Sequence, residues 1–283
     1  MANLTTTVLR SRAIRALVAT AENKFAPLRE WHRFEYQEHF GQTTFRPARM
    51  FSGVYPSVDE ALSAMPKHAR VGYDHEDMAD RHTSEGQQVW PSDYPVLFWL
   101  KSLLRDDSVV FDLGGSTGIS YYAFDKYLGY PQGLSWTVCE VPAVVRRGEE
   151  IAKERGECRL QFTTRFEDAN DADVCLVSGA LQFFETPLHV SLAQLIAKPR
   201  HLLINRTPFC PTPSFVTLHN LGPSICVYRI LNFQEFVGNL VSIGYSLVDR
   251  WKNAEFSCYI PFHPDRAIEA YEGMYFRLDA ATT

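Results

Sequence analysis

The chain has 283 residues and a formal net charge of −5 at pH 7, with 46% hydrophobic and 22% charged residues. This length suits one large globular domain with an extension, and the acidic balance gives no overall basic field for nucleic acid. No apolar run approaches the ~18–20 residues of a membrane span, so none is expected. The scattered cysteines show neither zinc-ligand spacing nor a disulfide framework, which suits buried thiols in a reducing, cytoplasmic location. They are Cys139, Cys158, Cys175, Cys210, Cys226 and Cys258.

The N-terminal region, residues 1–95, predicts a helical cap that packs on a larger domain, residues 96–283. Residues 1–24 predict an amphipathic helix. Ser57 and Glu60 form a capping-box pattern at the start of a further short helix. The aromatic side chains of this region suit either intramolecular packing or a homodimer, so the sequence leaves the oligomeric state open.

From residue 108 onward, apolar strand-like runs alternate with helical patterns, the order of a mostly parallel α/β sheet with helices on both faces. The last two strands lie three residues apart and predict an antiparallel hairpin. The predicted architecture is therefore a Rossmann-like, seven-stranded sheet that ends in this hairpin. A long proline-containing loop is expected over residues 206–231. The expected strands cover residues 109–112, 135–140, 159–163, 173–177, 201–205, 245–251 and 256–261, and the expected helices residues 96–104, 119–128, 143–155, 187–197 and 232–243.

A glycine-rich turn follows the first strand of this sheet and leads directly into a helix. Glycines let the backbone approach a ligand closely, and a helix N-terminus offers N–H groups, so the pattern predicts a nucleotide-type site. The dinucleotide pattern G-x-G-x-x-G fails, because Ser116 and Ile119 stand at its second and third glycine positions. No Gly-Lys follows, which excludes a P-loop. The expected contacts are Asp112, Gly114, Gly115, Ser116 and Gly118.

The acid-x-Gly-x-(Gly)-x-Gly arrangement resembles the first motif of class I S-adenosylmethionine (SAM) methyltransferases. Ligands of open α/β sheets lie beyond the carboxyl ends of the strands. Glu140, with Val141 beside it, ends the second strand and is predicted to accept both ribose hydroxyls, or alternatively to cap the next helix. The resemblance implies that Glu167 or Asp168 accepts from the adenine amino group, and a solvated acidic loop is the alternative.

Small residues and one amide follow the fourth strand, where the resemblance places the methionine part of SAM. A tight turn without ligand contact is the alternative for this segment. Tyr73, from the N-terminal cap, is a further candidate for the cofactor site. The candidates after the fourth strand are Ser178, Gly179, Leu181 and Gln182.

Two residues after the fifth strand are candidates for catalysis. Arg206 could hold a substrate carboxylate or phosphate through a bidentate fork, or pair with an acid of the cap. His219 suits a general base at neutral pH, and a surface or hydrogen-bonded histidine without a catalytic role is the alternative. Tyr73 and His75 of the cap are further candidates for this role.

A narrower resemblance rests on three blocks of sequence, and it spans residues 51–251. The blocks are Ser178-Gly179-Ala180-Leu181-Gln182-Phe183, Asn205-Arg206-Thr207-Pro208-Phe209 and the late helix that begins at Leu231-Asn232-Phe233. Together they resemble a bacterial family of SAM-dependent methyltransferases that is known mainly by sequence and often found near cell-surface polysaccharide genes. The resemblance implies SAM as the cofactor and leaves the acceptor open.

The resulting hypothesis is a SAM-dependent methyltransferase that acts on a small-molecule or sugar-like acceptor, with oxygen favoured over nitrogen. No metal is expected, because Ser178 and Asn205 stand where a metal-binding Asp/Asp/Asn set would be needed. Two alternatives remain open. One is an NAD-dependent oxidoreductase on a similar sheet, although the absence of the G-x-G-x-x-G pattern argues against it. The other is a catalytically inactive interaction module.

Overall fold

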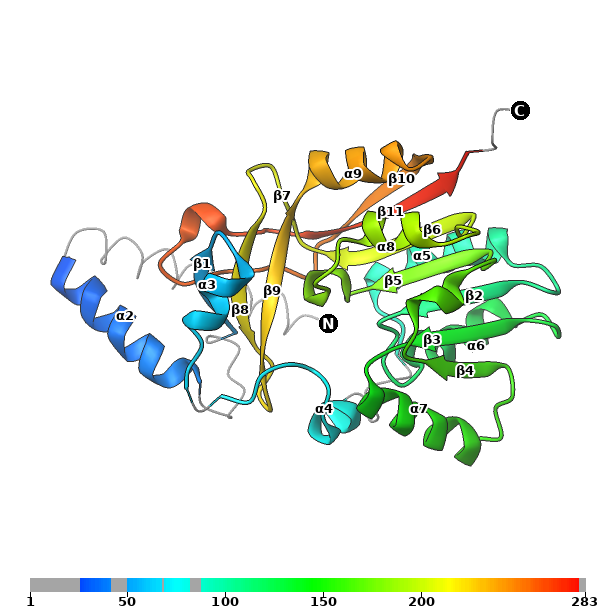
Figure 1. Cartoon of the computed structure of the whole chain (residues 1–283), viewed down its shortest axis with the longest axis horizontal. Helices are drawn as coiled ribbons and strands as arrows, with labels where there is room; N and C mark the ends of the chain where they lie inside the picture. The colour runs from blue at the N-terminus through cyan, green and yellow to red at the C-terminus, as the bar shows by residue number, and fades with distance from the viewer. Residues whose placement is uncertain (1–25, 42–49, 68, 82–87, 280–283) are drawn as a thin grey trace.

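The computed structural model of the protein describes residues 26–41, 50–67, 69–81 and 88–279 (Figure 1). The helix predicted over residues 1–24 lies outside these ranges. The described part contains a seven-stranded sheet, covered by helices, and a four-stranded sheet beside it.

The seven-stranded sheet has the strand order β10-β11-β6-β5-β2-β3-β4. The central strands are parallel, and β11 is antiparallel to both of its neighbours, β10 and β6. This confirms the predicted Rossmann-like, mostly parallel α/β sheet. The strands are β2 (Val109–Leu113), β3 (Ser135–Cys139), β4 (Leu160–Thr163), β5 (Val174–Ser178), β6 (His201–Thr207), β10 (Tyr245–Asn253) and β11 (Tyr271–Leu278).

Helices cover both faces of this sheet, which explains why its central strands are continuously apolar. Side chains alternate between the faces along a strand. On β5, Cys175 packs in one cluster with Leu192 of α8, while Leu176 packs in another with Leu100 of α5. The helices of this body are α5 (Tyr94–Leu103), α6 (Ile119–Leu128), α7 (Pro142–Glu154), α8 (Leu188–Gln194) and α9 (Phe233–Ser242), joined by the short 3-10 turns η2 (Pro91–Asp93), η3 (Phe166–Ala169) and η4 (Leu181–Phe183).

The four-stranded sheet, in the order β1-β8-β9-β7, was not predicted. The prediction of a loop over residues 206–231 is mostly wrong. This segment folds into the strands β7 (Phe209–Cys210), β8 (Phe215–Asn220) and β9 (Ile225–Asn232). Every residue of β8 is buried, so the polar and apolar alternation that reveals a half-exposed strand is missing. That burial depends on β1 (Phe51–Tyr55), an N-terminal strand that pairs antiparallel with β8.

The described part of the N-terminal region contains three helices and the strand β1, which was not predicted. Its helices are α2 (Ala26–Phe40), α3 (Val58–Ser63) and α4 (Glu76–Arg81). Ser57 caps α3, since its hydroxyl accepts from the Glu60 amide at 3.2 Å. The predicted division after residue 95 stays a prediction, but β1 makes the N-terminal region and the β8–β9 hairpin parts of one sheet.

The antiparallel pair at the end of the seven-stranded sheet is confirmed, but its second strand was misplaced. Residues 256–261 do not pair with β10, and β11 takes this position instead. Cys258 and Ile260 pack against Phe51 and Tyr228 of the four-stranded sheet. The segment between β10 and β11 therefore closes the space between the two sheets.

Candidate active site

The glycine-rich turn between β2 and α6 combines three left-handed residues. Gly114 has φ +74°, and a Cβ there would lie 2.3 Å from the Ala180 Cβ, so the turn packs directly on the segment after β5. Gly118 has φ +87° and is the N-cap of α6. Ser116 adopts φ 55° although it is not glycine. These conformations explain why glycines occur in this segment.

Asp112 is fully buried beneath this turn at the end of β2. Its Oδ2 accepts from the Trp136 indole N–H at 3.2 Å, while its Oδ1 has no hydrogen-bond partner among the described residues. A Cβ at Gly115 would lie 2.5 Å from this carboxyl group, so glycine is required for the close approach. Burial raises the pKa of Asp112 to about 7, which the Trp136 hydrogen bond opposes and the charge of Glu140 reinforces.

Glu140 links the turn to the next strand. Its Oε1 accepts from the Ser116 amide at 3.1 Å, and its Oε2 accepts from the Val141 amide at 3.0 Å. Burial raises the pKa of Glu140 to about 7, and these two backbone N–H groups oppose the rise. Val141 is the N-cap of α7 and contributes no side-chain cap. Glu140 therefore bonds the glycine turn itself, and its contact with a ribose stays a prediction.

A pocket of about 380 Å³ opens at the carboxyl ends of β2 and β3. Of the predicted residues, Glu140, Val141 and Leu181 line it. Phe166 and Phe184 line it too and were not predicted as site residues, although Phe166 directly precedes the predicted acids. The remaining lining residues are Leu113, Cys139, Pro142, Thr164, Glu185, Thr186, Leu188 and Ser191.

The two acids predicted for adenine, Glu167 and Asp168, are exposed on η3. Asp168 accepts from the Thr163 hydroxyl at 2.6 Å and lies 3.4 Å from the Arg165 guanidinium. Neither acid is among the residues that line the pocket. The contact with adenine stays a prediction, and Phe166 is the side chain that η3 turns toward the pocket.

The turn after β5 brings further polar groups to the same end of the sheet. Gly179 has φ +73°, and the Gln182 amide Nε2 donates to its carbonyl at 2.7 Å. The Oε1 of Gln182 and the Oγ of Ser116 are buried without a hydrogen-bond partner in the described part of the chain. Ser178 receives a 3.4 Å hydrogen bond from Asn205.

His219 lies on β8 in a cluster of aromatic rings. Its imidazole stacks on Phe51 with ring centroids 4.6 Å apart and on Phe183 of η4 with centroids 6.0 Å apart. Tyr228 meets it edge-on at 5.0 Å. Tyr73 reaches the same cluster through Phe183, at 6.3 Å. The four-stranded sheet thus presents His219 to η4, while Phe184, the residue after Phe183, lines the pocket.

Arg206 follows Asn205 at the end of β6 and adopts φ 53°. Its Nε donates to the Ser92 hydroxyl at 2.9 Å, and an Nη donates to Asp93 at 2.6 Å. Its guanidinium also lies 5.1 Å from the Phe256 ring centroid. The arginine therefore makes the cap ion pair that the sequence offered as the alternative to substrate binding.

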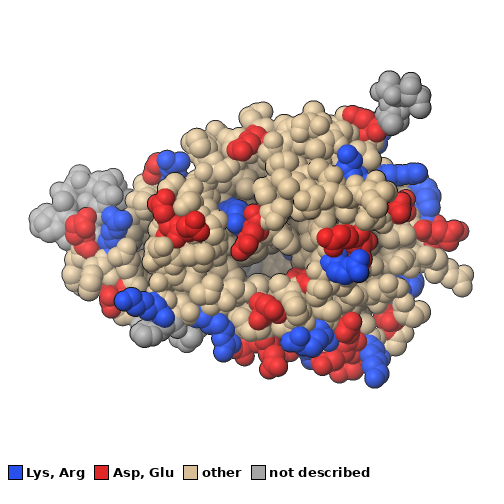
Figure 2. All heavy atoms as spheres, viewed as in Figure 1, with Lys and Arg blue, Asp and Glu red and all other residues tan. Residues whose placement is uncertain are grey.

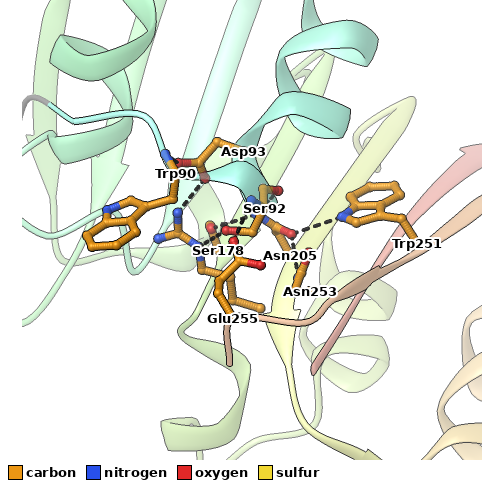
Figure 3. Close-up of polar contacts among 9 residues, drawn as sticks. Trp90, Ser92, Asp93, Ser178, Asn205, Trp251, Asn253 and Glu255 are labelled. Carbon is orange, nitrogen blue, oxygen red and sulfur yellow. Dashed lines mark hydrogen bonds and ion pairs between the residues drawn. The ribbon is translucent and has the colours of Figure 1, made fainter. Parts of the chain in front are cut away.

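Asn205 is fully buried and ties the same region together (Figure 3). Its Oδ1 accepts from Trp251 at 3.1 Å and from Asn253 at 2.9 Å, and its Nδ2 donates to the Ser92 carbonyl at 3.0 Å. The Ser92 amide in turn donates to Glu255 at 2.6 Å. The end of β6 is thereby fixed to both η2 and β10.

Other functional features are few in the part of the chain that the structure describes. No group of three or more His, Cys, Asp and Glu side chains within it is placed to hold a metal ion. No helix among the described residues has the length and apolar character to cross a membrane. The face in Figure 2 carries acidic and basic side chains interspersed, with a hollow near its centre.

Comparison with known proteins supports the fold. No protein-family model and no curated protein matches the chain. A chain of the complex between the Haloferax volcanii Trm112 methyltransferase activator and a protein described as a methyltransferase is 14% identical, with a TM-score of 0.52 over 73% of this chain and 97% of that one. The [4+2]-cyclase SpnF is also 14% identical, with a TM-score of 0.51 over 81% and 100%.

A Burkholderia thailandensis 1,6-didemethyltoxoflavin-N1-methyltransferase, crystallised with its substrate and S-adenosylhomocysteine, is 20% identical over 76% of this chain and 94% of that one, with a TM-score of 0.46. At these identities the likeness concerns the fold alone. The chain shares a Rossmann-like α/β fold with the Haloferax protein and the cyclase.

We expect Arg206→Leu to destabilise the protein by about 3 kcal/mol, because it leaves the buried Asp93 carboxylate without its cation. Combining it with Asp93→Asn, which keeps an acceptor for the Trp90 amide, should recover part of the loss. Urea denaturation of both single variants and the double variant measures the coupling. Additive effects would contradict the ion pair's role as an anchor.

The raised pKa of Asp112 predicts a pH-dependent stability. The folded state retains a proton that the unfolded chain releases above about pH 4, so the contribution of Asp112 to stability is largest in acid and is lost as the pH rises through about 7. The free energy of unfolding should drop by at least ~1.4 kcal/mol between pH 5 and pH 8, the equivalent of one pKa unit. Asp112→Asn should make the free energy of unfolding, measured by urea titration, depend less on pH. An unchanged pH dependence would contradict a raised pKa of the buried Asp112 carboxyl group.

Proposed function

We propose that the protein is a SAM-dependent methyltransferase. One observation carries this proposal: a glycine cradle lies beside buried polar atoms that have no partner among the described residues. These atoms are Asp112 Oδ1, Ser116 Oγ and Gln182 Oε1. Leaving buried polar groups unpaired costs free energy, so such groups call for a polar ligand. The residues present therefore fit this cofactor.

Each part of the site has a separate task in this proposal. Glu140 accepts the ribose hydroxyls, and Phe166 supports the adenine in the adjoining pocket. The turn around Gly179 and Gln182 takes the methionine part. When bound, SAM supplies an electrophilic methyl group, so this chain's work is to orient an acceptor in line with it and to exclude water.

We place the acceptor on the side of η4 that faces the four-stranded sheet. Phe51, Phe183 and Tyr228 surround His219 there with aromatic surface. For an oxygen acceptor, His219 is the proposed general base that takes the hydroxyl proton. Such a base favours oxygen over nitrogen as the methylated atom. A small-molecule or sugar-like acceptor, the bacterial family and a cytoplasmic location stay predictions.

The alternatives differ in their ligands. The fold alone does not decide among them, since a [4+2]-cyclase shares it. An oxidoreductase would bind NAD, whereas an inactive module would release no S-adenosylhomocysteine with any acceptor. The unpaired polar atoms at the glycine turn favour a bound cofactor over an empty module.

S-adenosylhomocysteine should raise the melting temperature of the wild-type protein, and NAD should not, because only a ligand of the folded state stabilises it. Gly114→Ala should abolish this shift, since the new methyl group meets Ala180 in the segment after β5 and so distorts the turn. Gly129→Ala is the matched control. It imposes a similar strain, at φ +55° beyond α6, but enters open space, so the shift should persist.

Glu140→Ala should also remove the shift through the loss of the ribose acceptor. A rise in the melting temperature of the wild-type protein with NAD, and none with S-adenosylhomocysteine, would contradict the proposal.

His219→Ala should lower methyl transfer by at least ~10²-fold with an oxygen acceptor, the usual contribution of a general base. Its affinity for S-adenosylhomocysteine should stay within about threefold of wild type, since His219 does not line the pocket. Candidate hydroxylated small molecules would be screened with methyl-labelled SAM, and calorimetry would give the affinity. Full transfer by the variant would exclude His219 as the base.

A further inference from the structure

A segment of the N-terminal region, residues 70–81, bridges the four-stranded sheet and α7; we call it the strap. At its start it pairs with β9, where the Ile225 amide donates to the Arg70 carbonyl at 2.9 Å and the Gly72 amide donates to the Ile225 carbonyl at 3.1 Å. At its end, α4 lies beside α7 (Figure 1). Asp80 of α4 lies 3.1 Å from Arg147 of α7.

The middle of the strap is well packed. Met78 is fully buried in a cluster with Leu221 and Cys226 of the β8–β9 hairpin. Tyr73 contacts Phe183 of η4 in the same cluster. The strap therefore touches elements of both the proposed acceptor side and the proposed cofactor side.

The N-terminus of α7 lacks a cap from its own side chains. Its N-cap is Val141, and Pro142 at the first helical position has no N–H. The amides of Val144 and Val145 donate to the Val141 carbonyl. The Ala143 amide instead donates to Asp74 Oδ1 of the strap, at 2.8 Å. The helix is thus capped by a carboxylate from a segment 69 residues earlier in the chain.

We infer that Asp74 is a positioning residue for the cofactor acid. The first turn of α7 begins directly after Glu140, and the Glu140 carboxylate accepts from the Val141 amide. Asp74 accepts from the amide of Ala143, the next residue after Val141 that has an N–H group. This hydrogen bond fixes the backbone that directs the Glu140 carboxylate toward the glycine turn. This inference rests on the proposed function, because it assigns Asp74 to the affinity for the cofactor. Asp74 acts through the backbone and makes no cofactor contact of its own.

The test compares three variants of the full chain. Asp74→Ala removes the cap, and Asp74→Asn keeps an acceptor oxygen at the same place. Asp80→Ala is the control, since it breaks the exposed strap pair with Arg147 and leaves Ala143 capped. Calorimetry measures the Kd for S-adenosylhomocysteine, and hydrogen exchange measures the protection of residues 140–146 without ligand.

Asp74→Ala should raise the Kd about tenfold, equivalent to ~1.4 kcal/mol. Asp74→Asn should stay within about threefold of wild type, and Asp80→Ala should leave the Kd unchanged. Exchange at residues 140–146 should be faster in Asp74→Ala only. Equal Kd values for Asp74→Ala and wild type, or an equal loss in Asp80→Ala, would overturn the inference.

The exchange measurement keeps the inference separate from the proposed function. If the wild type does not bind S-adenosylhomocysteine, the proposed function fails and the cofactor role of Asp74 fails with it. Faster exchange in Asp74→Ala would then leave Asp74 as a cap of α7 alone. If the wild type binds and exchange in Asp74→Ala is unchanged, the positioning role is excluded while the cofactor site stands.

Discussion

The site depends on one hydrogen bond, from the Ser116 amide to the Glu140 carboxylate. It joins the turn after β2 to the end of β3, two strands that run parallel in register up to Leu113 and Cys139. Asp112 is buried and Glu140 is partly buried, so donor groups must lie close to them. The left-handed turn and the start of α7 supply two backbone N–H donors to Glu140. Gly114, Gly115 and the Asp112 carboxyl group are packed around this link.

The second organising feature is the four-stranded sheet. Strands from residues 51–55 and 215–232 come together only because β1 pairs with β8. Their sheet sets His219 against Phe183, and the network around Asn205 holds the end of β6 in place between the sheets. The cofactor side is thus built by successive strand–helix units, whereas the acceptor side is assembled from distant segments.

This difference explains which predictions succeeded. The units from β2 to β6, with helices α6 to α9, follow from local hydrophobic periodicity and from glycine chemistry in the turns. The turn at Asp112–Gly118 and the position of Glu140 at the end of the next strand were predicted correctly for the same reason. The strands β8 and β11 were missed, because most of their residues are buried and each pairs with a strand that is remote in sequence, β1 for β8 and β6 for β11. The apolar residues of 256–261 suited a strand equally well, but they pack on the other sheet.

By itself, the sequence determined the α/β class, the order of the parallel strands along the chain and the glycine turn with its two acids. Each of these depends on neighbouring residues and on the conformations that glycine permits. Only the tertiary structure decided that Phe166 lines the pocket, that Arg206 pairs with Asp93 and that Asp74 caps α7. Those contacts join groups brought together by packing, and the partners of Arg206 and Asp74 lie 113 and 69 residues away, where no local pattern records them.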